Sequence, residues 1–294
     1  MKDVLMLTML LLSGSASGQV THGKQETRVG KALTRTIEFG GVRRTFFVRL
    51  PSEFSADRVY WPLVVVHGGG GGALKNPKAI RIRRKANERN LPAIVICPEF
   101  KTADKQVSRF PVLGEAAFLE AVLKRVRAEF SLHPKILLTG YSMGGQFSHR
   151  FALAKPDLIQ ACAPFSAGTW STPDGRLLIE GYGEVKDPKV FLSSPGNANT
   201  VTKRLRNLFD KRTADIAGLP AAEGARDVPF LVMCGTLDSR LSIAREFADS
   251  LANAGFTVET GWPRTPHREE NYEAEFEDYA NRAISFFKKH IQAR

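Results

Sequence analysis

The sequence has little cysteine: Cys97, Cys162 and Cys234 are the three among 294 residues. Three thiols cannot all pair, and their spacing fits no set of metal ligands, so a disulfide-built scaffold and a cysteine metal site are both excluded. Each cysteine lies in an apolar stretch such as IVICPEF. We therefore expect buried free thiols, and a single disulfide between two of them is the alternative in an exported protein.

Hydrophobic runs long enough to cross a membrane are also lacking, because a spanning helix needs about 20 apolar residues. The first run, residues 4–12, is short and is followed by small residues that end at Gly18. This layout is typical of a signal peptide over residues 1–18. We expect cleavage near Gly18, a secreted or periplasmic protein that begins near Gln19, and no stable membrane insertion.

Acidic residues are scarce relative to basic ones: 30 Asp and Glu against 42 Lys and Arg give a net charge of +12. Such a balance is compatible with a nucleic-acid partner. However, the basic residues are spread along the chain, and no zinc-finger or RNA-binding motif accompanies them. We expect no nucleic-acid partner, and we interpret the densest basic group, residues 81–85, as a solvated helix face.

The order of apolar segments predicts an α/β fold. After a polar lead (19–33), residues 34–39 and 44–50 predict a hairpin around Gly40 and Gly41. Short apolar runs without alternation, typical of parallel strands buried on both faces, follow at 63–66, 93–97, 136–139, 158–164 and 230–234. Helix-length segments alternate with them at 77–90, 115–130, 143–154, 242–254 and 274–291, and a last strand is expected at 257–260. We expect one domain, 34–294, with a mostly parallel sheet covered by helices on both faces and an opening antiparallel hairpin.

Residues 169–228 interrupt this alternation with polar, proline- and glycine-containing sequence. The segment is too long for an ordinary connection. We interpret it as an insertion that carries a helix at 200–216 and lies over the edge of the sheet or over the site.

A nucleophile motif follows the strand predicted at 136–139. The sequence GYSMGG places Ser142 between Gly140 and Gly144, at a turn from strand to helix. A G-x-S-x-G turn is so tight that the serine is strained and side chains at the glycines would collide with neighbouring backbone. The pattern therefore predicts that the Ser142 hydroxyl is presented at the start of a helix, ready for nucleophilic attack.

A second element is His67 followed by five glycines, residues 68–72, after the strand predicted at 63–66. A loop without side chains lets backbone N–H groups approach a developing oxyanion. A phosphate-binding loop is disfavoured because neither Gly-Lys-Ser/Thr nor G-x-G-x-x-G is present. We expect Met143 and either Gly69 or Gly70 to supply the oxyanion hole, with His67 in a structural role.

The motifs HGGGGG, GYSMGG and GTLD, followed by a late histidine, resemble the α/β-hydrolase superfamily of serine esterases. Within it the chain is similar to secreted polyhydroxybutyrate-depolymerase-like and feruloyl-esterase-like enzymes. The resemblance implies that Ser142 is the nucleophile and that Asp238, after a buried strand, is the triad acid, in the order Ser, acid, His. His267 follows the last strand, and we expect it to be the general base; His149 lies inside the helix that Ser142 begins and points away.

The expected function is therefore hydrolysis of a small-molecule or polymeric carboxylic ester through an acyl-enzyme, with no cofactor and no metal. Short-acyl, polyester and carbohydrate-linked esters are the expected substrates. A serine peptidase or amidase of the same fold, and a non-catalytic binding protein on a hydrolase scaffold, are the alternatives. Tyr141, Trp170 and Trp262 lie beside the motifs and are candidate substrate contacts, with ordinary packing as the alternative for each.

Overall fold

The computed structural model describes residues 32–69, 72–73, 77–100, 112–181, 183–185, 220–267 and 273–292. The expected signal peptide (1–18), nearly all of the polar lead (19–33), Gly70 and the expected insertion helix (200–216) lie outside these residues. None of the helices in this described part is long and apolar enough to cross a membrane.

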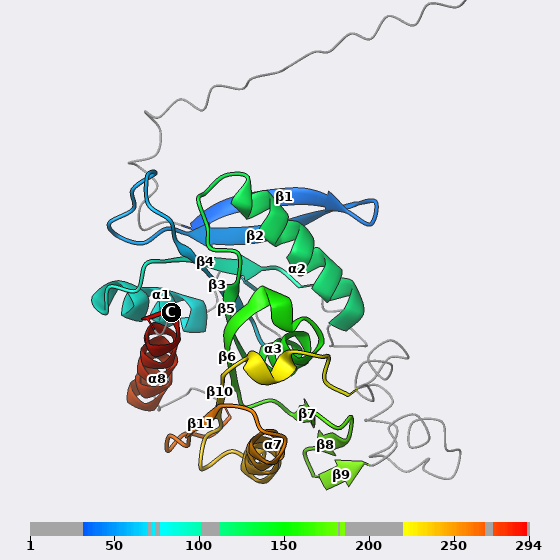
Figure 1. The fold of residues 1–294 in the computed structure, drawn as a ribbon. Coiled ribbons are helices and arrows are strands. Elements are labelled where there is room, and N and C mark those ends of the chain that lie inside the picture. The colour runs from blue at the N-terminus through cyan, green and yellow to red at the C-terminus, as the bar shows by residue number, and fades with distance from the viewer. Residues whose placement is uncertain are drawn as a thin grey trace, which may run out of the picture.

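An eight-stranded sheet runs through the described structure in the order β1-β2-β4-β3-β5-β6-β10-β11 (Figure 1). Its strands are Ala32–Phe39 (β1), Val42–Arg49 (β2), Trp61–Val66 (β3), Ala93–Pro98 (β4), Ile136–Tyr141 (β5), Ile159–Phe165 (β6), Phe230–Met233 (β10) and Val258–Gly261 (β11). β1 and β2 form the expected hairpin, in which Gly40 and Gly41 have φ of 58° and 71°. From β4 to β11 every pairing is parallel, so the predicted mostly parallel sheet is confirmed.

Helices cover both faces of this sheet, as the unbroken apolar runs of its strands require. On one face lie α2 (Val112–Arg127), α3 (Met143–Ala154) and α7 (Leu241–Asn253); on the other lie α1 (Pro77–Glu88) and α8 (Glu273–Gln292) (Figure 1). Within β3, Val64 and Val66 point into the first layer, and Leu63 and Val65 point into the second. The sheet is therefore buried between two apolar cores.

The first part of the expected insertion is a second, three-stranded antiparallel sheet that the sequence analysis did not predict. It contains β7 (Thr169–Ser171), β8 (Leu177–Ile179) and β9 (Gly183–Val185), and it lies beside α7 (Figure 1). β7 and β8 are buried throughout. This part of the chain is therefore not a polar surface loop, and it brings the end of β8 close to the loop that follows β10.

All three cysteines are free and buried, as expected. Burial raises the pKa of Cys97 to about 12 and that of Cys162 well above its usual value. Inert core thiols of this kind have no disulfide partner and little thiolate at neutral pH.

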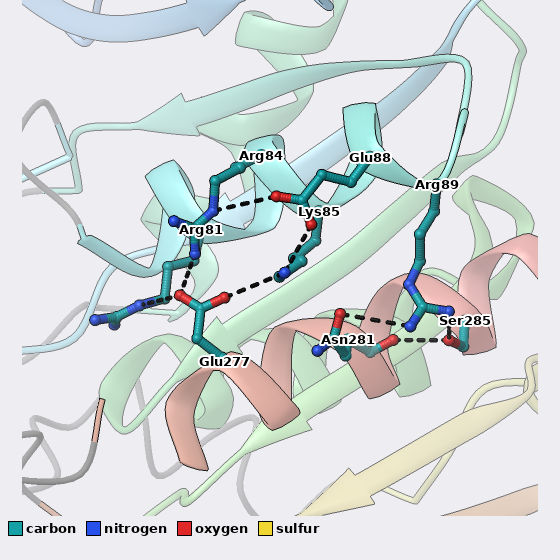
Figure 2. A network of polar contacts seen from close by, with 8 residues as sticks. All are labelled: Arg81, Arg84, Lys85, Glu88, Arg89, Glu277, Asn281 and Ser285. Atoms are coloured by element: carbon teal, nitrogen blue, oxygen red, sulfur yellow. Dashed lines mark hydrogen bonds and ion pairs between the residues drawn. The ribbon is translucent and has the colours of Figure 1, made fainter. Parts of the chain in front are cut away.

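The basic segment 81–85 joins α1 to α8 (Figure 2). Glu277 of α8 accepts a hydrogen bond from Arg81 Nε at 3.0 Å and another from Arg84, and Lys85 Nζ lies 3.5 Å from its second oxygen. Further along, Arg89 reaches Ser285 Oγ at 2.8 Å. The expected solvated helix face is thus partly an interface between two helices.

Candidate active site

The parallel strands bring the sequence motifs to one edge of the sheet. Tyr141, at the end of β5, pairs with Phe165 at the end of β6. Phe165 also pairs with Met233 at the end of β10, and Met233 pairs with Gly261 at the end of β11. Ser142 follows β5 directly, and Asp238 and His267 lie in the loops after β10 and β11. Because the carboxyl ends of parallel strands share an edge, the three side chains come from neighbouring loops.

The backbone at Ser142 is strained in the way the motif predicts. Ser142 has φ 55° and ψ −114°, and a serine at positive φ persists only where the surrounding structure holds it. A Cβ added to Gly140 would lie 2.3 Å from the Gly144 carbonyl oxygen, and one added to Gly144 would lie 2.3 Å from the Val66 carbonyl oxygen. Both positions therefore admit only glycine, and the turn presents a partly exposed Ser142 at the first turn of α3.

Asp238 and His267, the residues predicted as triad acid and general base, are in contact. The Asp238 Oδ2 lies 3.0 Å from the His267 Nδ1, with 0% of the Asp238 side chain and 28% of the His267 side chain exposed. Burial by itself would raise the pKa of Asp238, but hydrogen bonds from His267 and from the Arg240 backbone N–H, with the Arg240 charge, hold it below its usual value. An ionised Asp238 accepts the Nδ1 proton, which leaves Nε2 as the basic nitrogen.

Tyr141 packs against this base. Its ring is stacked on the His267 ring, with centroids 5.1 Å apart and planes 18° apart, and the edge of Phe276 supports it from α8 at 5.8 Å. Tyr141 is buried, and this burial raises the pKa of its phenol. Tyr141 thus packs between His267 and Phe276, and its role as a substrate contact stays a prediction.

The glycine loop after β3 lies against the turn that holds the nucleophile. A Cβ added to Gly68 would lie 3.2 Å from the Tyr141 carbonyl oxygen, and one added to Gly69 would lie 2.6 Å from the Met143 Sδ. His67 fixes the start of this loop: its Nδ1 lies 2.9 Å from the Gly68 carbonyl oxygen, and its Nε2 accepts the Phe100 N–H at 3.2 Å. The loop therefore lies against the turn that carries Ser142, and the contacts of His67 are those of a residue that holds the loop in place.

Trp170 is not at the site. Its side chain is 0% exposed and lies between the rings of His149 and Phe247, at centroid distances of 4.9 and 4.6 Å. The hypothesis of a substrate contact is wrong for Trp170 because β7 is a core strand. Trp262 is half-buried, packs against the core and lies 5.7 Å from the Arg245 guanidinium, so packing accounts for the contacts that it makes.

His149, the histidine nearest to Ser142 in sequence, uses both ring nitrogens within the core. Its Nδ1 lies 2.9 Å from the Gly145 carbonyl oxygen, and its Nε2 accepts the Ser171 N–H at 2.9 Å. Burial, together with the neighbouring Arg150 charge, lowers its pKa well below the usual value. A neutral ring with both nitrogens occupied cannot act as the base, as the sequence analysis expected.

Two charged residues at the site were not predicted. Arg240 contacts the Asp238 carboxylate through its backbone N–H and its Nη1, and Glu180, after β8, pairs with the Arg240 Nη2 at 2.8 Å. Arg240 stands two residues after the acid in the motif GTLDSR, so a charged residue in that loop was a usable signal. Glu180 has no local signal, because it comes from the small sheet.

Comparison with protein-family models and with curated protein sequences gives no match. Solved structures do match. A ferulic acid esterase superposes with a TM-score of 0.63 at 18% identity, over 87% of this chain and 98% of its own. The chain has the α/β-hydrolase fold. A thermostable esterase from Pseudomonas putida superposes with a TM-score of 0.63 at 16% identity, over 90% of this chain and 84% of its own. An S-formylglutathione hydrolase from Staphylococcus aureus superposes with a TM-score of 0.56 at 18% identity, over 86% of this chain and 96% of its own.

Proposed function

We propose that the protein is a carboxylic-ester hydrolase that acts through an acyl-enzyme on Ser142. The observation that carries the proposal is the 3.0 Å contact of Asp238 with His267, at the sheet edge where the strained Ser142 is presented. A buried carboxylate, an oriented imidazole and a serine held on a strained turn are the three parts that nucleophilic acyl transfer needs.

In the first half-reaction the Ser142 Oγ attacks the ester carbonyl carbon while the His267 Nε2 takes the hydroxyl proton. The carbonyl oxygen becomes an oxyanion, which accepts hydrogen bonds from the Met143 N–H and from Gly69 or Gly70. Collapse of this intermediate breaks the bond to the leaving oxygen, and the imidazolium returns the proton to it. The alcohol leaves, and the acyl group stays on Ser142.

In the second half-reaction water attacks the acyl-enzyme, again with His267 as the base, and the carboxylic acid is released. Asp238 stabilises the imidazolium in both halves and keeps the Nδ1 proton in place. Tyr141 limits rotation of the imidazole because the two rings are stacked. The electrostatic and orienting contributions therefore come from groups that are already in position before the substrate binds.

The substrate class that we propose is a short-acyl, polyester or carbohydrate-linked ester. Structures with this fold include proteins named as a ferulic acid esterase and an S-formylglutathione hydrolase, which supports tests with an aromatic ester and with a thioester. Leu237 precedes Asp238 in the chain and is 46% exposed, and we propose it as an apolar contact for the substrate. We also propose that residues 1–18 direct export, which the apolar run 4–12 and the small residues before Gly18 support.

The proposed function is tested with protein beginning at Gln19 and a panel of p-nitrophenyl acetate, a feruloyl sugar, a thioester, polyester film and an amino-acid amide. We expect ester hydrolysis, and we expect Ser142→Ala to lower kcat by several orders of magnitude while melting is unchanged. Hydrolysis of the amide alone would make the protein an amidase. Turnover of nothing on the panel would favour a binding protein on a hydrolase scaffold.

A further inference from the structure

The Asp238 carboxylate is held on both of its oxygens. Oδ2 contacts the His267 Nδ1, and Oδ1 accepts the Arg240 backbone N–H at 3.1 Å and the Arg240 Nη1 at 3.2 Å. With its side chain 0% exposed, Asp238 is stabilised by protein groups rather than by water. The Arg240 side chain, 18% exposed, therefore acts on the same carboxylate that orients the base.

A second carboxylate lies on the far side of Arg240. The Arg240 Nη2 lies 2.8 Å from the Glu180 Oε2, and the Ser239 Oγ donates to the Glu180 Oε1 at 2.5 Å. The Glu180 backbone N–H in turn donates to the Gly168 carbonyl oxygen at 3.1 Å, just after β6. Glu180 is 32% exposed and is fixed both at its backbone and at its carboxylate.

We propose that Arg240 and Glu180 are positioning residues that set, through Asp238, the pH at which His267 gains its proton. This proposal rests on the proposed function, because His267 has to be neutral to act as the base. The charges alternate along the chain of contacts: Asp238 is negative, Arg240 positive and Glu180 negative. Arg240 weakens the attraction of Asp238 for the imidazolium, and Glu180 partly offsets Arg240.

The signs of the two effects are opposite. Removing the Arg240 charge leaves Asp238 a stronger partner for the imidazolium, so His267 should hold its proton to higher pH. Removing the Glu180 charge leaves Arg240 without its partner, so His267 should lose its proton at lower pH. The Arg240 effect should be the larger, because Coulomb energies fall with distance and Glu180 is partly exposed to screening solvent.

Two neutral side chains, Tyr141 and Cys234, adjoin this chain of contacts. Tyr141 stacks on His267, and burial raises the pKa of its phenol. Cys234 lies beneath Asp238; burial first and the Asp238 charge second raise the pKa of its thiol to about 12. Beside Gly168, the Gln146 side-chain amide lies next to the Arg240 guanidinium: a Cβ added to Gly168 would lie 3.3 Å from the Gln146 Nε2 and 3.2 Å from the Arg240 Nε. Near neutral pH the formal charges among these contacts are thus carried by Asp238, Arg240 and Glu180.

The experiment compares Arg240→Gln and Glu180→Gln with the wild type by two readouts. One is the acid limb of the kcat/KM profile, and the other is the titration of the His267 imidazole by NMR, which needs no turnover. We expect Arg240→Gln to move both midpoints up by roughly half to one pH unit and Glu180→Gln to move both down by a smaller amount. Arg240→Lys should restore at least part of the shift.

Two matched controls remove the same charges without touching Asp238. Arg245→Gln removes an exposed cation of α7, and Glu184→Gln removes the partner of Arg176, 2.7 Å away in the small sheet. Both should leave the midpoints within about 0.2 unit, because screened surface charges interact weakly.

A fall in melting temperature with no shift of either midpoint in Arg240→Gln or Glu180→Gln would overturn the proposal and leave a purely structural ion pair. Shifts in the same direction would also overturn it. If the wild type hydrolyses nothing while the NMR midpoints still move in opposite directions, the proposed function fails and the electrostatic chain stands. Since Glu180 is partly exposed, Glu180→Gln keeps the test open if Arg240→Gln does not fold.

Discussion

Gly235 lies where the loop that carries Asp238 contacts the loop that carries His267. We expect Gly235→Ala to move these two loops apart. A Cβ at this position would lie 2.0 Å from the Thr265 carbonyl oxygen and 2.3 Å from the Thr265 Oγ1. The same carbonyl oxygen accepts the Leu237 N–H at 3.1 Å, and the Thr236 N–H donates to Pro263 at 2.8 Å. These two bonds connect the loop that carries Asp238 to the one that carries His267.

The size of the effect follows from these distances. Ordinary contact with a Cβ begins at 3.4 Å, so the loops would have to move apart by more than an ångström. A displacement of about 1 Å in the reacting groups costs on the order of 100-fold in rate. The overpacked contact should lower the free energy of unfolding by about 1–3 kcal/mol, and each kcal/mol lowers Tm by roughly 2–4 °C in a domain of this size.

The assay is kcat/KM for p-nitrophenyl acetate, with Tm measured on the same preparations. Gly261→Ala is the matched control, because the atoms nearest to its Cβ belong to the flexible Met233 and Arg282 side chains, at 3.0 and 3.3 Å, and not to the backbone. We expect the control to stay within about twofold of the wild type, since repacking flexible side chains costs little. Normal kcat/KM in Gly235→Ala would refute the view that this contact sets the distance between Asp238 and His267.

Three further predictions concern the site and the core. Gly69→Val should lower kcat by roughly 100-fold, because the branched side chain would meet Met143, whose Sδ would lie 2.6 Å from the new Cβ, and would block the approach of the substrate to the expected oxyanion donors; a normal kcat would place those donors elsewhere. Asp238→Asn should lower kcat by about four orders of magnitude. The pKa of Asp238 is below its usual 3.8, so its ionised form stabilises the fold above that pH. This contribution disappears as pH falls through the pKa of the folded state. The plot of Tm against pH should therefore be flatter at acid pH for Asp238→Asn than for the wild type. Because the pKa of His149 is lowered, the unfolded chain takes up this proton first, and wild-type stability loses the His149 contribution as pH falls below 6.5. His149→Gln should reduce this decline and leave kcat/KM little changed. A dead His149→Gln enzyme would contradict the assignment of the base.

The sequence was sufficient for the main sheet because its strands are buried on both faces. Runs such as 63–66 and 136–139 are apolar without interruption, and the helices between them have one apolar side, so the order and type of these elements followed from residue pattern. The small sheet was missed. Its turn, Pro173-Asp174-Gly175, was interpreted as a break, although the Thr172 N–H donates to the Arg176 carbonyl oxygen at 2.9 Å across a hairpin between β7 and β8. The Pro-Asp-Gly sequence is a turn signal that would have predicted it.

The positions of Ser142, Asp238 and His267 were predictable because each follows a strand, and parallel strands end at one edge. The direction of a side chain was not predictable in the same way. Trp170 stands near the motifs in sequence but points into the core, since its strand lies beneath α7. The contact of Glu180 with Arg240 joins residues 60 positions apart through two different sheets, and no local pattern encodes it.

The central claim, that Ser142 is the activated nucleophile, is tested most directly by labelling with a fluorophosphonate probe and mapping the modified peptide by mass spectrometry. We predict one label on Ser142, no label in Ser142→Ala, and labelling of His267→Ala slowed by several orders of magnitude, because the probe reacts with a serine that is activated by its base. A label on another residue, or an unlabelled wild-type protein that is folded by circular dichroism, would contradict the account.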